Sequence, residues 1–322
     1  MRRAVATQMA KKPAEVVELI ELDPPVAQPG WTLVRVRAAA LNQHDLWSVR
    51  GVGTRPEQFP LGLASDVAGV TEDGREVLVH SLVADPAHMA GGGELLDPAR
   101  AMLAERTTGG AADAVLVPER NLVDKPASLS FEAAACLPTA WLTAYHMLFT
   151  TAGARPGQRV LVQGSAGGVA QAAIALGVHA GLKVYVTGRS AERRAAAEAL
   201  GAYAVLESGA RLPERVDHVI DTVGAATWEH SLRSVRPGGN VVIAGATTGG
   251  QVELDLFRVF LPHVRILGTS MGTVEELRDL VSMVAVAGID PVVDSVYDLA
   301  EAAAAVARLA SGEAAGKVLI RP

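Results

Sequence analysis

A glycine-rich turn between an apolar run and an alanine-rich stretch constrains the fold of this chain more than any other feature. The apolar run covers residues 159–162, the helical stretch covers 168–180, and the turn reads Gly164-x-x-Gly167-x-x-Ala170. Glycine lets the backbone bend tightly and approach a pyrophosphate, whose charge meets the free N–H groups at the helix N-terminus. The spacing departs from Gly-x-Gly-x-x-Gly, but its setting between strand and helix predicts a dinucleotide site. The alternative is a tight turn that binds no ligand.

The same alternation of strands and helices continues along the second half of the chain. Residues 191–200 form another helical stretch, which ends at Gly201. Further apolar runs lie at 183–186, 204–206, 218–220, 241–243 and 264–267. Strands that are apolar throughout and separated by helices are typical of a parallel sheet covered on both faces. The pattern therefore predicts an α/β domain of the doubly wound Rossmann type.

The first 120 residues show a different pattern, in which short alternating runs are broken by turns. Residues 32–37 alternate between apolar and polar side chains, and residues 74–79 follow a turn. This part is predicted to be rich in β-strands with long loops. The C-terminal run 316–320 is also a predicted strand, and we expect it to pair in the first domain.

The residues after the second strand of the α/β domain indicate which dinucleotide binds. An Asp or Glu about 20 residues beyond the glycine turn would hold the ribose hydroxyls of NAD. No acid directly follows residues 183–186; instead Arg189, Ser190 and Arg193 are found there. Guanidinium groups bind phosphate oxygens well, so this composition favours the 2′-phosphate of NADPH. The alternative is that Ser190 only caps the next helix while Arg193 and Arg194 lie on its solvated face.

Composition narrows the function classes. Hydrophobic residues make up 49% of the chain, which excludes an intrinsically disordered protein. The net charge of −6 argues against a nucleic-acid partner, and no apolar stretch suits a membrane span or a leader. The single cysteine, Cys136, excludes an intramolecular disulfide and a cysteine-rich zinc site, and we expect it to pack in the core. We expect a cytoplasmic protein.

Four stretches of the sequence resemble one enzyme family. They are residues 41–45 with Arg50-Gly51, residues 62–70, residues 129–145, and the glycine turn with residues 221–224. Together they resemble the medium-chain dehydrogenase/reductase superfamily, specifically its zinc-free quinone oxidoreductase branch. The resemblance implies a GroES-like catalytic domain at 1–120, completed by 286–322, with a Rossmann cofactor domain at 121–285. It also implies a cleft between the domains and a homodimer paired through the cofactor domains.

The resemblance, with the residues after each strand, assigns the site. The expected dinucleotide contacts are Gly164, Ser165, Ala166, Gly167, Gly168, Val169, Thr187, Gly188, Arg189, Ser190, Arg193, Thr222, Val223, Gly224, Gly245, Ala246, Ser270 and Lys317. The expected catalytic residues are Asn42, Thr139 and Asp45. The Asn42 amide can donate a hydrogen bond to a substrate oxygen. Asp45 is expected to fix its loop by accepting hydrogen bonds from backbone N–H groups rather than to act as an acid.

Departures from the zinc-containing branch predict that no metal is bound. The zinc-containing branch has Cys at the position of Asn42 and His-Glu at the positions of Ser65-Asp66. The cysteine-rich lobe of that branch corresponds to residues 83–108 of this chain, which hold no cysteine. Zinc requires three or four N, S or O ligands. The conceivable substitute ligands are His44, Asp45, Asp66 and His88. Such lone side chains are more often loop or surface groups.

The same comparison bears on the reaction. Enoyl reductases of the superfamily often place a Tyr in the loop after the Asn-x-x-Asp motif, but residues 46–49 contain none, so solvent is the expected proton source. Trp47 either lines the substrate pocket or packs as a structural aromatic. We predict an NADPH-dependent oxidoreductase that reduces a quinone or an α,β-unsaturated carbonyl without zinc, since conjugation already spreads the developing charge. One alternative is an NADPH-binding module with little catalysis. Another is a zinc alcohol dehydrogenase, for which this chain lacks the metal ligands.

Overall fold

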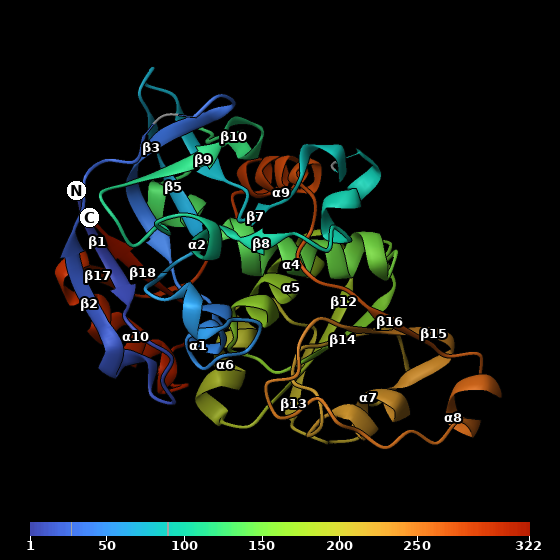
Figure 1. The fold of residues 1–322 in the computed structure, drawn as a ribbon. Helices are drawn as coiled ribbons and strands as arrows, with labels where there is room; N and C mark the ends of the chain where they lie inside the picture. Colours follow the sequence, from blue (N-terminus) through green and yellow to red (C-terminus); the bar gives the residue numbers. More distant parts are fainter. Residues whose placement is uncertain (27, 89) are drawn as a thin grey trace. The chain divides into compact units, whose positions relative to one another are not determined.

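The computed structural model describes residues 1–26, 28–88 and 90–322, in which two compact units are distinguished (Figure 1). Unit 1 comprises Met1–Thr139 and Thr273–Pro322, and unit 2 comprises Ala140–Gly272. The domains that the resemblance implies, at 1–120 with 286–322 and at 121–285, have bounds that differ from those of these units. Helix α3 (Phe131–Ala135) falls in unit 1 because it packs on strands β3 and β5, and α9 (Val274–Ala287) does so because it packs on β10.

Unit 2 is built on a parallel sheet with the strand order β13–β12–β11–β14–β15–β16, which confirms the predicted doubly wound α/β class. Its strands are β11 (Arg159–Gln163), β12 (Lys183–Gly188), β13 (Ala204–Glu207), β14 (Val216–Asp221), β15 (Val235–Ile243) and β16 (Arg265–Gly268). The order reverses direction beside β11, because the chain adds β12 and β13 on one side and β14 to β16 on the other. Ligands of such sheets bind outside the carboxyl ends of the strands at this switch point.

Helices connect these strands and bury both faces of the central ones. Val160, Leu161 and Val184 have no exposed surface, which explains why their segments are apolar throughout. The helices of unit 2 are α4 (Leu142–Tyr145), α5 (Gly168–His179), α6 (Ala191–Ala199), α7 (Trp228–Ser234) and α8 (Phe257–Phe260), with a π-helical turn at η7 (His146–Thr151). Another π-helical turn, η6 (Leu137–Trp141), spans the division between the two units. In the described residues, no helix is long and apolar enough to cross a membrane.

Unit 1 is β-rich, and its larger sheet has the order β10–β6–β5–β3–β18–β17, with β9 also pairing with β3. The strands are β3 (Trp31–Ala40), β5 (Asp66–Thr71), β6 (Glu76–Val79), β9 (Ala114–Pro118), β10 (Leu122–Asp124), β17 (Val293–Asp298) and β18 (Lys317–Arg321). A second sheet joins β1 (Arg2–Ala6), β2 (Val17–Glu21) and β4 (Leu61–Gly62), and β7 (Leu82–Val83) pairs with β8 (Ala101–Met102). The remaining helices include α1 (Gln43–Val49), α2 (Leu103–Arg106) and α10 (Ala302–Ala310). The β-rich unit and the parallel α/β unit expected from the sequence are thus both present.

The pairing of β3 gathers three polar residues at one end of this sheet. Ala40, the last residue of β3, lies opposite Asp66 on β5 and opposite Leu319 on β18. Asn42 follows directly after β3, and Lys317 is the first residue of β18. The strand register therefore brings together side chains that are up to 275 positions apart in the sequence.

Candidate functional site

The glycine turn of unit 2 has the geometry of a phosphate cradle. It connects β11 to the N-terminus of α5, and Gly164 has a φ of +87°, a conformation that only glycine adopts without strain. An added Cβ at Gly167 would meet no atom of the described residues within 4 Å, so the backbone there faces open space. These features fit the phosphates of a dinucleotide, which approach the backbone N–H groups at a helix N-terminus.

A cavity of about 130 Å³ opens beside this turn. Its lining includes Gly164, Ser165, Ala166, Gly167, Thr187, Gly188, Arg189, Arg193, Ser208, Val223 and Thr227. Nine of the residues assigned from the sequence to the dinucleotide lie around this one cavity, whereas Ser208 and Thr227 were not assigned. The adjoining strand ends explain the gathering, because β11, β12 and β14 are parallel neighbours whose carboxyl ends share one edge.

The other assigned residues of unit 2 follow the same rule. Gly168 and Val169 begin α5, Thr222 and Gly224 follow β14, Gly245 and Ala246 follow β15, and Ser270 follows β16. At Gly224, where φ is +89°, an added Cβ would lie 2.6 Å from the Gly249 carbonyl oxygen, so no larger residue fits. All of them lie beyond the carboxyl ends of neighbouring parallel strands.

Two of the assigned side chains support the loop from within. The Thr187 hydroxyl donates to Gln163 Oε1 at 2.6 Å and is buried. Ser165 packs on Gly188, where an added Cβ would lie 2.3 Å from Ser165 Oγ. Close packing therefore requires glycine at position 188, and the Thr187 hydroxyl proton is already used inside the protein.

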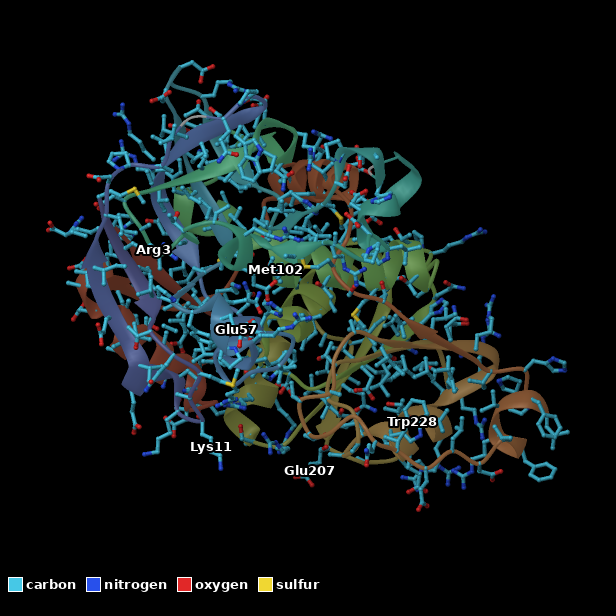
Figure 2. The ribbon with its side chains drawn as sticks, in the orientation of Figure 1. Arg3, Lys11, Glu57, Met102, Glu207 and Trp228 are labelled. Atoms are coloured by element: carbon cyan, nitrogen blue, oxygen red, sulfur yellow. The ribbon has the colours of Figure 1, made fainter. Side chains whose placement is uncertain are left out.

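The arginines after β12 divide into two roles. Arg189 and Arg193 line the cavity. Arg194 instead donates from Nη1 to the carbonyl oxygens of Gly188 and Arg189, at 3.0 and 3.2 Å, and lies 3.4 Å from the Glu207 carboxylate at the end of β13 (Glu207 is labelled in Figure 2). Arg194 thus holds the turn that carries Arg189, a role that the sequence did not indicate.

Ser190 lies next to this turn and caps a helix. Its Oγ accepts from the Arg193 backbone N–H at 3.3 Å, so it is the N-cap of α6. This is the structural role weighed as the alternative to a phosphate contact.

A buried network fixes the turn after β14. The carboxylate of Asp221 accepts from the backbone N–H groups of Val223 at 2.8 Å and Gly224 at 3.1 Å. It also accepts from the hydroxyls of Thr227 at 2.9 Å and Ser231 at 2.7 Å. Asp221 therefore shapes the edge of the cavity while its own oxygens are fully used.

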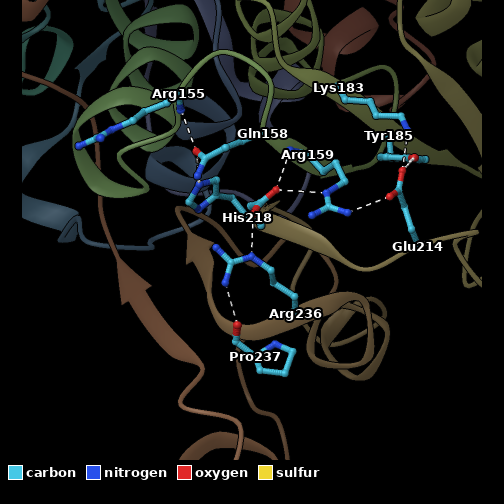
Figure 3. Close-up of polar contacts among 10 residues, drawn as sticks. Arg155, Gln158, Arg159, Lys183, Tyr185, Glu214, His218, Arg236 and Pro237 are labelled. Atoms are coloured by element: carbon cyan, nitrogen blue, oxygen red, sulfur yellow. Dashed lines mark hydrogen bonds and ion pairs between the residues drawn. The ribbon is translucent and has the colours of Figure 1, made fainter.

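An ion-pair network lies at the amino ends of the strands of the same sheet (Figure 3). Glu214 accepts from Lys183, Tyr185 and, at 2.8 Å, Arg159, while Asp217 accepts from Arg159 and Arg236. Hydrogen bonds from Lys183, Tyr185 and Arg159 lower the pKa of Glu214 to about 2. These groups lie at the amino ends of β11 and β12, away from the glycine turn, and they tie the strands together.

Unit 1 contains a buried polar cluster around Asp66, whose side chain has no exposed surface. Asp66 Oδ2 accepts from Asn42 Nδ2 at 2.9 Å and from Lys317 Nζ at 3.0 Å. Asp66 Oδ1 accepts from Ser81 Oγ at 2.8 Å and from the Thr139 hydroxyl. Two of the expected catalytic residues, Asn42 and Thr139, therefore share one carboxylate.

Lys317 completes this cluster. Its side chain is 4% exposed, and Nζ donates to Asn42 Oδ1 at 2.6 Å and to the Leu41 carbonyl oxygen at 3.0 Å, in addition to Asp66. The sequence assigned Lys317 to the dinucleotide and weighed Asp66 only as a conceivable metal ligand. The available signal was a charged residue at the first position of each of two strands that continue with apolar residues.

The expected role of Asp45 as a loop-fixing residue agrees with its contacts. Its carboxylate accepts from the backbone N–H of Asn42 at 2.7 Å and of Ala64 at 2.8 Å. Ala64 has a φ of +61°, a strained conformation for a residue with a side chain. Burial, the largest influence, raises the pKa of Asp45.

His44 lies beside Asp45 on α1 and pairs with a different carboxylate. Its Nε2 is 2.9 Å from Glu105 Oε1, which also accepts from Ser48 Oγ at 3.3 Å. Burial opposes protonation, but the hydrogen bond and charge of Glu105 raise the pKa of His44. Trp47, on the same helix, is half-buried.

The four side chains weighed as substitute zinc ligands are His44, Asp45, Asp66 and His88, and they have separate partners. Within residues 1–26, 28–88 and 90–322, no three His, Cys, Asp or Glu side chains are close enough to hold a metal. His88 pairs with Asp97 at 3.2 Å and His44 with Glu105, so the substitute set is not brought together. At Asn42 and Asp66 the ammonium of Lys317 already provides the positive charge. Position 89 of the expected loop at 83–108 lies outside the described residues.

Cys136 is the one thiol of the chain and lies at the C-terminus of α3. It is buried, and burial raises its pKa to about 12, so the thiolate form is strongly disfavoured. Its position agrees with the expected packing role.

Comparison with known proteins matches both units. The family described as alcohol dehydrogenase GroES-like domain matches residues 28–127, and the one described as zinc-binding dehydrogenase matches residues 168–286. The chain is 28% identical over 300 residues to a quinone oxidoreductase of Mus musculus, covering 87% of this chain and 86% of that protein. It is 27% identical over 329 residues to an acryloyl-coenzyme A reductase of Sulfurisphaera tokodaii, covering 96% and 98%.

A solved structure extends the likeness to the whole chain. A crystal structure described as an NAD-dependent alcohol dehydrogenase superposes with a TM-score of 0.92 at 32% identity and covers 100% of both chains. Enzymes with this architecture thus include relatives that act on quinones, on conjugated thioesters and on alcohols.

Proposed function

The chain belongs to the medium-chain dehydrogenase/reductase superfamily and is an oxidoreductase of that type, and we propose that it uses NADPH to reduce a quinone or an α,β-unsaturated carbonyl without zinc. The observation that carries the proposal is the cavity shared by the glycine turn, Arg189 and Arg193. The turn suits a pyrophosphate, and the two guanidinium groups suit the additional 2′-phosphate of NADPH.

When bound there, the dinucleotide supplies a hydride from C4 of its nicotinamide. The residues that we assign to holding it are the glycine turn, Arg189 and Arg193, with the strand ends at Thr222–Gly224 and Gly245-Ala246. Arg194 and Asp221 keep these loops in place through the hydrogen bonds described above.

The acceptor class is argued from the cluster in unit 1. A simple ketone gains most from a metal ion that polarises its oxygen, and in the part of the chain that the structure describes no three His, Cys, Asp or Glu side chains form a ligand set for one. In a conjugated carbonyl, the β-carbon accepts the hydride and the electron pair moves through the double bond to the oxygen. The α-carbon then takes a proton from solvent. In a quinone, one carbonyl oxygen accepts the hydride instead, and the other oxygen, which gains the negative charge, takes the proton to give the hydroquinone.

Asn42 is the donor that we assign to the oxygen of the acceptor. One Nδ2–H bonds Asp66, and the amide carries a second N–H that can donate to the developing negative charge. A preorganised donor of this kind stabilises the transition state more than the ground state. The Thr139 hydroxyl is the next candidate, although it already donates to Asp66.

Turnover assays decide between this function and a cofactor-binding module. NADPH oxidation is followed with a panel of quinones and α,β-unsaturated ketones after treatment of the protein with a chelator. We expect turnover with at least one acceptor and higher kcat/KM with NADPH than with NADH. Tight NADPH binding without turnover on any member of the panel would instead identify a binding module.

We also assign a homodimer to the cofactor unit. β16 is the edge strand of its sheet, and the nearby apolar side chains of Leu256, Phe257, Phe260 and Leu261 are 54–66% exposed. Four exposed apolar side chains beside an edge strand form a patch that is suited to contact with a second copy of the chain. Sedimentation should give a dimer for the parent and a monomer for F257D/F260D; a monomeric parent would contradict it. We expect the enzyme to work in the cytoplasm.

A further inference from the structure

We infer that the buried Lys317–Asp66 ion pair orients the side-chain amide of Asn42. Lys317 is thus a positioning residue of unit 1, and it is not a phosphate contact. The inference rests on the proposed function for its catalytic consequence, while the orientation of Asn42 can be measured without any turnover.

The N–H donors of Lys317 are all used within the protein. A lysine ammonium has three N–H donors. Lys317 Nζ has three acceptors within 3.0 Å, namely the Leu41 carbonyl oxygen, Asn42 Oδ1 and Asp66 Oδ2. Its side chain is almost fully buried, so every donor is used inside the protein and none is left for a phosphate.

The ion pair determines which of its two orientations the Asn42 amide adopts. Asn42 Oδ1 faces the ammonium at 2.6 Å, and Asn42 Nδ2 faces the Asp66 carboxylate at 2.9 Å. Rotating the amide by half a turn would point its NH₂ group at a cation and its carbonyl oxygen at an anion. Both contacts would then be repulsive, so the ion pair selects one orientation and leaves one particular N–H for the substrate.

The surrounding residues keep the pair itself in place. Ser81 and Thr139 donate to the other oxygen of Asp66, so the carboxylate accepts four hydrogen bonds. Asp45 holds the backbone N–H of Asn42 at 2.7 Å. Both ends of Asn42, its backbone and its amide, are therefore fixed by buried carboxylates.

The charge balance of the cluster explains why Lys317 is buried there. The Asp66 carboxylate would be an uncompensated buried charge without a cation, which is a costly arrangement. Lys317, from the C-terminal strand, supplies the compensating charge at 3.0 Å.

The test removes both charges together, because a single substitution would leave an unpaired buried charge that could unfold unit 1. In K317M/D66N the amide of Asn42 is free to rotate. We expect kcat to fall by about 10- to 100-fold, which is less than the roughly 100- to 1000-fold effect of removing a preorganised donor because Asn42 is still present, with the Kd of NADPH unchanged within about twofold. K317R keeps the charge and should retain more activity than K317M/D66N.

A second ion pair of unit 1 provides the matched control. Arg308 and Asp294 lie 2.8 Å apart, and the Asp294 side chain is 7% exposed. The variant R308M/D294N should lose stability but keep kcat. A kcat loss in the control equal to that in K317M/D66N would attribute the effect to general destabilisation and overturn the inference.

The orientation of Asn42 is read separately by NMR on the full chain with labelled asparagine, assigned by loss of the signals in N42A. We expect the two amide protons of Asn42 to be distinct and slow to exchange in the parent, and to exchange at least about tenfold faster in K317M/D66N. Unchanged exchange would refute the inference, as would a tenfold rise in the Kd of NADPH with kcat retained, which would make Lys317 a cofactor contact. If the parent reduces no acceptor, the proposed function fails, while the exchange measurement still decides the role of Lys317.

Discussion

Replacing Arg189 with alanine removes one of the two guanidinium groups that line the cavity beside the glycine turn. A hydrogen bond between charged groups contributes about 1.5–3 kcal/mol. Because Arg189 is exposed, solvent screening places its contribution near the lower limit. Since about 1.4 kcal/mol corresponds to a factor of ten, the preference for NADPH over NADH should fall by about tenfold.

The remaining guanidinium makes the prediction sharper. Arg193 lines the same cavity, so R189A/R193A should lose about another tenfold of the preference if the two contributions are independent. The assay compares kcat/KM for NADPH and NADH with one acceptor at constant ionic strength. Arg233, which is on α7 and 3.5 Å from Glu229, serves as the control, and R233A should leave the ratio unchanged. An unchanged ratio in both R189A and the double variant would refute the placement of the 2′-phosphate at this cavity.

Three further outcomes are expected. The protein should purify without stoichiometric zinc and stay active after chelation; one tightly held zinc per chain, lost together with activity, would refute this. N42A should lower kcat/KM by about 10- to 1000-fold. D45N should mainly lower the melting temperature, because Asp45 holds backbone N–H groups. Full activity of N42A on every acceptor would place the catalytic donor elsewhere, with Thr139 the next residue to test. The pKa of Glu214 is about 2 in the folded protein against an ordinary 4.5, so its contribution to stability is present above pH 4.5 and is lost as the pH falls towards 2. The difference in melting temperature between the parent and E214Q should therefore shrink over that interval, and a constant difference would contradict the assignment.

The α/β unit could be read from the sequence because its physics is local. Strands buried on both faces must be apolar throughout, as Val160 and Leu161 are, and glycine is required at a turn such as Gly164. The contacts around the cavity were also predictable, since parallel strands bring the residues after their carboxyl ends to one edge.

The cluster in unit 1 was only partly predictable. Asn42 and Asp45 belong to one short motif, but Asp66 and Lys317 are 251 positions apart and meet only because β3 pairs with both β5 and β18. No local pattern determines such a pairing. For the same reason the unit to which a helix such as α3 belongs could not be predicted, because a helical pattern does not indicate which sheet the helix packs on.

Hydride transfer to a conjugated acceptor is the central claim, and isotope transfer tests it most directly. The chelated protein is mixed with NADPH carrying deuterium at both C4 positions of the nicotinamide and with an α,β-unsaturated ketone, and the product is examined by mass spectrometry and NMR. We expect one deuterium at the β-carbon and a solvent proton at the α-carbon. A product without deuterium, or no product although NADPH is bound, would contradict the proposed reaction.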